Sequence, residues 1–180
     1  MDDKSTTADA GQILARAREN PEAFVKLYRM HYDAVFRYCA HRLFDRTAAE
    51  DITSDVFLKA IENISCFRGT EKQFGNWLYT IATNAVNNYL RKTVRQKSLL
   101  KTAYEQANNQ LADRGVLSER LALLKEAMLT LKPRYQTIIT LRFFENLKLT
   151  EIAEVLGSSP GTVRSQLARG LARLRKQLAV

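Results

Sequence analysis

Residues 147–167 of the chain read LKLTEIAEVLGSSPGTVRSQL, and this stretch decides the fold of the C-terminal half. Thr150 is expected to cap a short helix, and Gly157 to end it, because glycine tolerates the positive φ of a helix C-terminus. Ser159 can cap a second helix with Pro160 in its first turn, where a missing N–H costs nothing. The spacing therefore predicts two helices joined by a glycine turn, which is a helix-turn-helix motif.

The second helix of this motif has one apolar side and one basic side. The apolar side is formed by Val163, Leu167, Leu171, Leu174 and Leu178, at helical spacing. The opposite side offers small side chains edged by long hydrogen-bonding ones, which suits a helix lying in a DNA major groove. Five cations and no acid follow Gly157. An ordinary helical hairpin with a solvated basic face would explain the stripe, but not the turn residues and the one-sided charge together.

The composition extends this interpretation to the whole chain. Only 7 Gly and 3 Pro occur in 180 residues, too few for a turn-rich sandwich or barrel, so we predict an all-α protein. The net charge of +9 favours polyanionic partners, because phosphate contacts by Lys and Arg release counterions. Charge alone would equally suit an acidic protein partner or a membrane surface.

Upstream of the motif, apolar periodicity predicts three more helices. One begins after Pro21, one is announced by a capping box at Thr47–Glu50, and one begins at Asn76. A glycine-containing loop is expected between them at 66–75. Trp77, Ile81 and Tyr89 are expected to pack in the core of the last helix.

Four segments follow from these patterns. Residues 1–20 are expected to be a mobile N-terminus, and 21–92 a helical domain. Residues 93–117 are polar and weakly patterned, which predicts a flexible linker, and 118–180 form the helix-turn-helix domain.

Cysteines and histidines indicate neither a metal site nor a disulfide. Cys39 and Cys66 lie far apart, and with His31 and His41 they do not form a zinc-type spacing. The N-terminus has no signal-peptide pattern, and no apolar run is long enough to span a bilayer. We therefore expect a soluble, cytoplasmic protein without cofactor, metal or small-molecule substrate. The absence of a nucleophile motif or glycine-rich phosphate loop also argues against an enzyme.

Three motifs of the chain together resemble bacterial RNA polymerase sigma factors of the extracytoplasmic-function (ECF) subgroup. Residues 49–60, AEDITSDVFLKA, are similar to the helix that binds core polymerase. The run FRG at 67–69, followed by WLYTIATN at 77–84, resembles the promoter-melting segment, and GTVRS at 161–165 resembles the upstream-element reader. The resemblance covers about 24–92 and 118–178, in the expected order.

This resemblance implies roles for particular residues. Contacts to core polymerase are expected from Asp51, Asp55, Phe57 and Leu58. Recognition and melting of the minus-10 element are expected from Phe67, Phe74, Asn84, Asn87, Asn88, Arg91 and Lys92. Recognition of the minus-35 element as a duplex is expected from Thr162, Arg164, Ser165, Ala168, Arg169 and Arg173. The resemblance also implies an anti-sigma factor as a partner, besides core polymerase and promoter DNA.

Some residues depart from the family pattern. Gln166 stands where the subgroup often has a basic residue, and Gly170 interrupts its usual Arg-Ala-Arg run. A rival hypothesis is a helix-turn-helix repressor or activator that acts without core polymerase. Such a regulator would bind a palindromic duplex tightly as a dimer. The asparagine-rich face and the basic run before the linker suit single-stranded DNA and favour the sigma factor.

Overall fold

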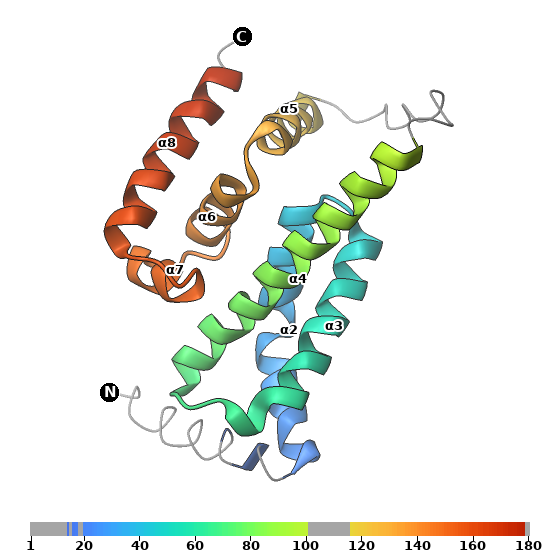
Figure 1. The fold of residues 1–180 in the computed structure, drawn as a ribbon, viewed down its shortest axis with the longest axis vertical. Helices are drawn as coiled ribbons and strands as arrows, with labels where there is room; N and C mark the ends of the chain where they lie inside the picture. The colour runs from blue at the N-terminus through green and yellow to red at the C-terminus, as the bar shows by residue number, and fades with distance from the viewer. Residues whose placement is uncertain (1–13, 15, 18–19, 101–115, 179–180) are drawn as a thin grey trace.

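The structure is a computed structural model that describes residues 14, 16–17, 20–100 and 116–178 (Figure 1). Within these residues the regular elements are helical, as the all-α prediction expects. They are α2 (Pro21–Leu43), α3 (Arg46–Asn63), the short 3-10 helix η1 (Ile64–Cys66), α4 (Glu71–Leu100), α5 (Val116–Thr130), α6 (Pro133–Phe143), α7 (Leu149–Val155) and α8 (Pro160–Leu178). None of the described helices is long and apolar enough to cross a membrane.

The N-terminal module consists of α2, α3 and α4. The side chain of Asn20 caps α2 by accepting a hydrogen bond from the backbone N–H of Glu22, 2.8 Å away. The predicted cap of α3 at Thr47 is wrong. Asp45 is the cap, and its carboxylate accepts from the N–H of Ala48 at 3.0 Å. Phe44, with φ of 53°, makes the turn that brings Asp45 to this position.

Helix α4 is longer at both ends than the sequence pattern predicts. It begins at Glu71, so the predicted loop 66–75 is wrong in its second half. Thr70 and Gln73 form the cap, since the Gln73 side chain accepts from the N–H of Thr70 at 2.9 Å. The helix continues to Leu100, so residues 93–100 are helical rather than linker. The rest of the predicted linker up to 115, most of the predicted N-terminal segment and residues 179–180 lie outside the described residues.

The C-terminal module consists of α5–α8 and contains the predicted helix-turn-helix. Gly157 has a φ of 57° between α7 and α8, as the turn requires. Ser159 caps α8, accepting from the N–H of Thr162 at 3.1 Å. The predicted cap at Thr150 is wrong, because α7 begins at Leu149 and the capping position is Lys148, two residues before Thr150. Gly170 lets α8 approach α6: a β-carbon there would lie 3.2 Å from the β-carbon of Tyr135.

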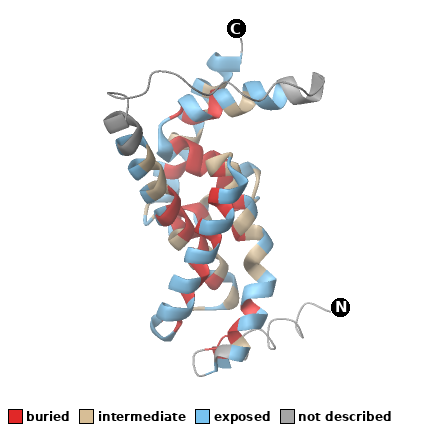
Figure 2. Ribbon diagram, turned by 90° about the vertical axis from the view of Figure 1, so that its right-hand side faces the viewer, coloured by how far each residue is buried: buried red, intermediate tan, exposed pale blue. Residues whose placement is uncertain are grey.

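The two modules pack against each other. Helix α7 lies on α4, and α6 lies on α2 (Figure 1). Buried apolar residues from both modules belong to one connected cluster, which includes Leu78 and Val86 of α4 and Ile152 and Val155 of α7. Figure 2 shows this buried core continuing from one module into the other. A flexible linker alone would not predict this docked arrangement.

Candidate nucleic-acid interface

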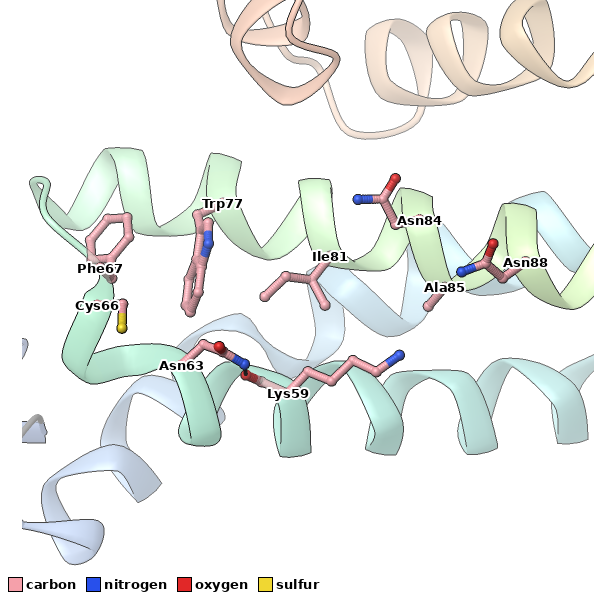
Figure 3. Close-up of a pocket in the computed structure, with 9 residues that line it drawn as sticks. All are labelled: Lys59, Asn63, Cys66, Phe67, Trp77, Ile81, Asn84, Ala85 and Asn88. Carbon is pink, nitrogen blue, oxygen red and sulfur yellow. Dashed lines mark hydrogen bonds between the residues drawn. The ribbon is translucent and has the colours of Figure 1, made fainter.

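A pocket of about 400 Å³ lies between α3, the segment after it and the middle of α4 (Figure 3). It is lined by Lys59, Asn63, Cys66, Phe67, Trp77, Ile81, Asn84, Ala85 and Asn88. Trp77 and Ile81 extend from α4 toward α3, while Lys59 and Asn63 lie on the α3 side. A partly apolar cavity edged by a cation and three amides can hold a flat ring that carries hydrogen-bonding groups.

Two aromatic rings, those of Phe67 and Trp77, line this pocket, and the ring of Phe74 packs behind them. The Phe67 centroid lies 5.1 Å from that of Trp77, and Phe74 lies 5.5 Å from each of them. The ring of His31, whose pKa is lowered by burial, packs behind Phe74 at 5.4 Å. Phe74 is fully buried, so it supports the wall and offers no face for stacking, which corrects the expectation from the sequence. Phe67 lines the pocket with 9% of its surface exposed.

Asn84, Asn87 and Asn88 of α4 do not act as one group. Asn84 and Asn88 line the pocket and are exposed. Arg91 donates a hydrogen bond to the side-chain oxygen of Asn88. Asn87 is half-buried and accepts instead from the guanidinium of Arg42, at 3.0 Å. The structure therefore separates Asn87 from the two residues with which the sequence groups it.

A second hollow, of about 620 Å³, adjoins the pocket along α3 and α4. It shares three lining residues with the pocket, namely Lys59, Ala85 and Asn88. Its lining also includes three exposed cations of α4, Arg91, Lys92 and Arg95, together with Asp55 of α3. A pocket for a nucleobase that continues into a mostly cationic groove suits single-stranded DNA. Its bases stack on aromatic rings, while its phosphates contact cationic side chains.

Helix α8 presents its predicted reading residues outward. Thr162, Arg164, Ala168, Arg169 and Arg173 are exposed, and Ser165 is half-exposed. Val163 is buried on the opposite side, and Leu167, Leu171 and Leu174 pack on the core of the module. Arg134 and Arg173 both lie over the ring of Tyr135, at 4.8 and 5.5 Å. Because these two arginines lie on α6 and α8, the cationic surface reaches from α8 onto α6. A hydrogen bond from Arg134 also lowers the pKa of the Tyr135 phenol.

The acidic side of α3 forms a third surface. Asp51 and Asp55 are exposed. Leu58, which follows them along α3, exposes 60% of its surface. Phe57 does not belong to this surface. It is 4% exposed, and its ring packs 4.7 Å from that of Tyr28, so the expectation that it contacts a partner is corrected.

Sequence reasoning missed several residues of the pocket. Trp77 and Ile81 line it, although they were expected to be core residues only. Lys59 lies inside the motif at 49–60 that was assigned to polymerase binding, and Asn63 lies just after it, so neither was considered for the pocket. Their spacing of four places them on one side of the helix, next to the FRG segment, and this signal could have found them.

Two family models match the chain, one in each module. The family model described as sigma-70 region 2 matches residues 27–96, and that described as sigma-70, region 4 matches residues 121–174. RNA polymerase sigma factor YlaC of Bacillus subtilis is 34% identical, over 84% of this chain and 90% of its own. The ECF RNA polymerase sigma factor SigW of the same organism is 33% identical, over 87% of this chain and 89% of its own.

Two solved structures share the fold. CnrH, in complex with the cytosolic domain of CnrY, superposes with a TM-score of 0.71 at 22% identity, over 94% of this chain and 97% of its own. The sigma factor RpoE of Bartonella quintana, in complex with the anti-sigma factor NepR, superposes with a TM-score of 0.68 at 23% identity, over 87% of this chain and 97% of its own.

The two family models, one in each helical module, define this protein as a two-module transcription initiation factor. The chain belongs to the sigma-70 family and is an ECF-type RNA polymerase sigma factor. It directs core RNA polymerase to promoters and is not itself an enzyme. The region 2 match removes the support for a regulator that acts without core polymerase.

Proposed function

We propose that the pocket between α3 and α4 captures a base flipped out of the minus-10 element, and so stabilises the melted promoter. The single observation that carries this proposal is the joining of an aromatic-walled pocket to a groove lined by four cations. Unstacking a base costs a few kcal/mol, which ring contacts and edge hydrogen bonds inside a pocket can offset. Asn84 and Asn88 supply these hydrogen bonds, while Asn63 and Lys59 face them from α3.

The strand on either side of the captured base follows α4. Arg91 and Lys92 lie beside the pocket and contact phosphates, which positions the strand without reading its sequence. Asn87 is given a different role, because it is half-buried and its side-chain oxygen accepts from the buried Arg42, whereas Asn88 and its partner Arg91 are both exposed.

Helix α8 reads the minus-35 element as a duplex. Arg164, Ser165 and Ala168 meet base edges in the major groove. Thr162, Arg169 and Arg173 contact phosphates and hold the helix in register. The exposure of all six side chains on one helix supports this assignment.

The acidic side of α3 binds core polymerase through Asp51, Asp55 and Leu58. An exposed leucine beside two carboxylates combines apolar contact with charge complementarity. We also propose that the protein acts in the cytoplasm, where its polymerase is, and that an anti-sigma factor restrains it. The second proposal is supported by the folds of CnrH and RpoE, each solved with such a partner chain or domain.

The decisive experiment mixes the protein with sigma-free core polymerase and follows co-elution, then maps start sites on genomic fragments. We expect co-elution and new start sites that depend on the protein. A double variant, Asp51→Ala with Leu58→Ala, should lose co-elution, whereas Glu126→Ala, on the exposed side of α5, should retain it. Unchanged co-elution of the double variant would remove α3 as the polymerase-binding surface.

A further inference from the structure

Besides the shared apolar cluster, the interface between the two modules carries three sets of polar contacts. Its most buried member is Glu145, which follows α6 and whose side chain has no exposed surface. One of its oxygens accepts hydrogen bonds from Arg37 of α2 and from the hydroxyl of Tyr79 of α4, both at 3.0 Å. The ring of His41 lies 4.0 Å from the other oxygen. One oxygen of this carboxylate is thus held by two donors of the N-terminal module, while the other is buried beside His41 without a hydrogen bond among the described residues.

A second polar junction between the modules is centred on Arg42. Arg42 of α2 is 1% exposed and donates to the side-chain oxygen of Gln136 on α6 and to that of Asn87 on α4. The Gln136 amide in turn donates to the backbone oxygens of Met128 and Leu131, at 2.9 Å each. One arginine therefore links three helices from both modules.

The third set of contacts joins α7 to the outer side of α4. Lys72 pairs with Glu151 at 2.8 Å, Asn76 donates to Glu154 at 2.8 Å, and the hydroxyl of Thr80 donates to a backbone oxygen of α7 at 3.2 Å. These α4 residues recur every four positions and so form one row along the helix.

The next member of this row is Asn84, at the edge of the base pocket. The polar contacts of α7 thus end one helical turn before the residue proposed to hold the flipped base. Carboxylates of the C-terminal module meet cations, amides and hydroxyls of α2 and α4 in the way that the phosphate oxygens of a strand would.

We propose that the C-terminal module acts as an intramolecular cover for the strand-binding side of α4. In the free chain, the carboxylates of Glu145, Glu151 and Glu154 occupy the donors of α2 and of the row on α4. Binding of an opened strand along this row requires the modules to separate, so closure and strand binding exclude each other. The part of this inference that concerns DNA rests on the function proposed above for the pocket.

The chemistry of the interface suits a reversible closure. The polar groups of this interface can be hydrated again on opening, whereas the apolar cluster that the two modules share favours the closed state. If only a fraction of the chains is open, the apparent affinity for a strand equals the affinity of the open form multiplied by that fraction. A substitution that loosens the interface should therefore raise the affinity of the free chain for single-stranded DNA.

The first test measures the separation of the modules in the free chain. Dyes are attached at Glu62→Cys and Gln177→Cys, both exposed positions, in a Cys66→Ser background, since the remaining Cys39 is buried. Energy transfer is compared for Glu145→Gln, for Arg37→Gln and for Glu126→Gln as the matched control. We expect lower transfer for the first two variants and no change for the control.

Arg37→Gln serves as the second variant because it lies on the other module and its side chain is 51% exposed. It loosens the same contact without disturbing the helix-turn-helix, should Glu145→Gln fail to fold. Energy transfer unchanged in both folded variants would overturn the proposal, because the contact would then contribute nothing to closure.

The second test measures binding of a labelled single-stranded oligonucleotide with the minus-10 sequence to the unlabelled free chains. We expect Glu145→Gln and Arg37→Gln to bind about three- to tenfold more tightly than wild type. Open modules without tighter binding would overturn the covering role. Combining either variant with Asn84→Ala separates the two proposals. If opening strengthens binding but Asn84→Ala does not weaken it, the pocket assignment fails while the cover stands.

Discussion

The two DNA-contact surfaces of the protein are built in different ways. The surface on α8 is one exposed side of a single helix, and its six predicted residues all reach solvent. The pocket beside α4 is assembled from α3, the FRG segment and α4, with a buried aromatic wall. A surface that reads a stable duplex needs only one exposed helical face, whereas one that holds an unpaired base needs a cavity walled by several segments. A neighbouring module can cover the second kind of surface, and here α7 packs on α4, the helix that lines the pocket.

The largest expected effect comes from filling the pocket through Cys66. This thiol is exposed, whereas burial raises the pKa of the Cys39 thiol to about 11, so a maleimide reacts with Cys66 much faster. We expect the modified holoenzyme to lose almost all promoter melting by permanganate footprinting, while duplex binding at the minus-35 element persists. Cys66→Ser treated in the same way should melt normally. Full melting by completely modified protein would place the base elsewhere.

Replacing Arg164 tests the α8 surface alone. Arg164→Ala should weaken recognition of the minus-35 element by about 1–3 kcal/mol, if the guanidinium makes a bidentate contact to a base. The preference at one base pair should relax, as measured by competition between promoter variants. Arg175→Ala, also exposed on α8 but in its last turn, should leave the sequence preference unchanged. Equal effects of the two variants would reduce Arg164 to a phosphate contact.

The pair Asn84→Ala and Asn87→Ala tests the separation of the α4 asparagines. Asn84→Ala should lower the amount of open complex about tenfold, with core polymerase binding unchanged, because one edge hydrogen bond to the base is lost. Asn87→Ala should instead lower the free energy of unfolding by about 1 kcal/mol, because a buried arginine N–H loses its acceptor. Urea unfolding and permanganate footprinting distinguish these outcomes. The reverse pattern would contradict the assignment of both residues.

The smallest effect is expected from Glu151. Its pKa is lowered by the ammonium of Lys72 and by the backbone N–H of Lys148. Its contribution to closure is therefore fully present above the usual glutamate pKa of about 4.3, and is lost as the pH falls through the lowered value. Because the Lys72 side chain of the pair is 70% exposed, Glu151→Gln should change the open fraction at pH 7 by less than about twofold. A larger change would mean that the pair dominates closure.

Local signals were sufficient to predict the helix-turn-helix from the sequence. Gly157 and Ser159 each fix their own part of the backbone, so the turn and the start of α8 follow from residues next to them. The same rule would have found the start of α4, because Thr70 and Gln73 have capping-box spacing. Helix periodicity also placed the α8 side chains correctly, since a single helix decides which residues face solvent.

The rest depends on contacts between distant segments. Phe74 and Phe57 are aromatic residues near functional motifs, but neighbours far along the sequence bury them, among them His31 and Tyr28. Asn87 shares its helix with Asn84, yet Arg42 draws it into the interior. No local pattern reports these partners. The docking of the modules is invisible for the same reason, because its polar contacts join residues about 65–110 positions apart.

The connection between α4 and α5 has a consequence for the strength of the closure. Because residues 101–115 tie the two modules together, each meets the other at an effective concentration of about 1 mM, the scale typical of short tethers. An interface too weak to join two separate proteins is then sufficient to keep one chain closed. The same tether acts in the opposite direction on DNA: once one module has bound a promoter element, the local concentration of the other rises at the second element.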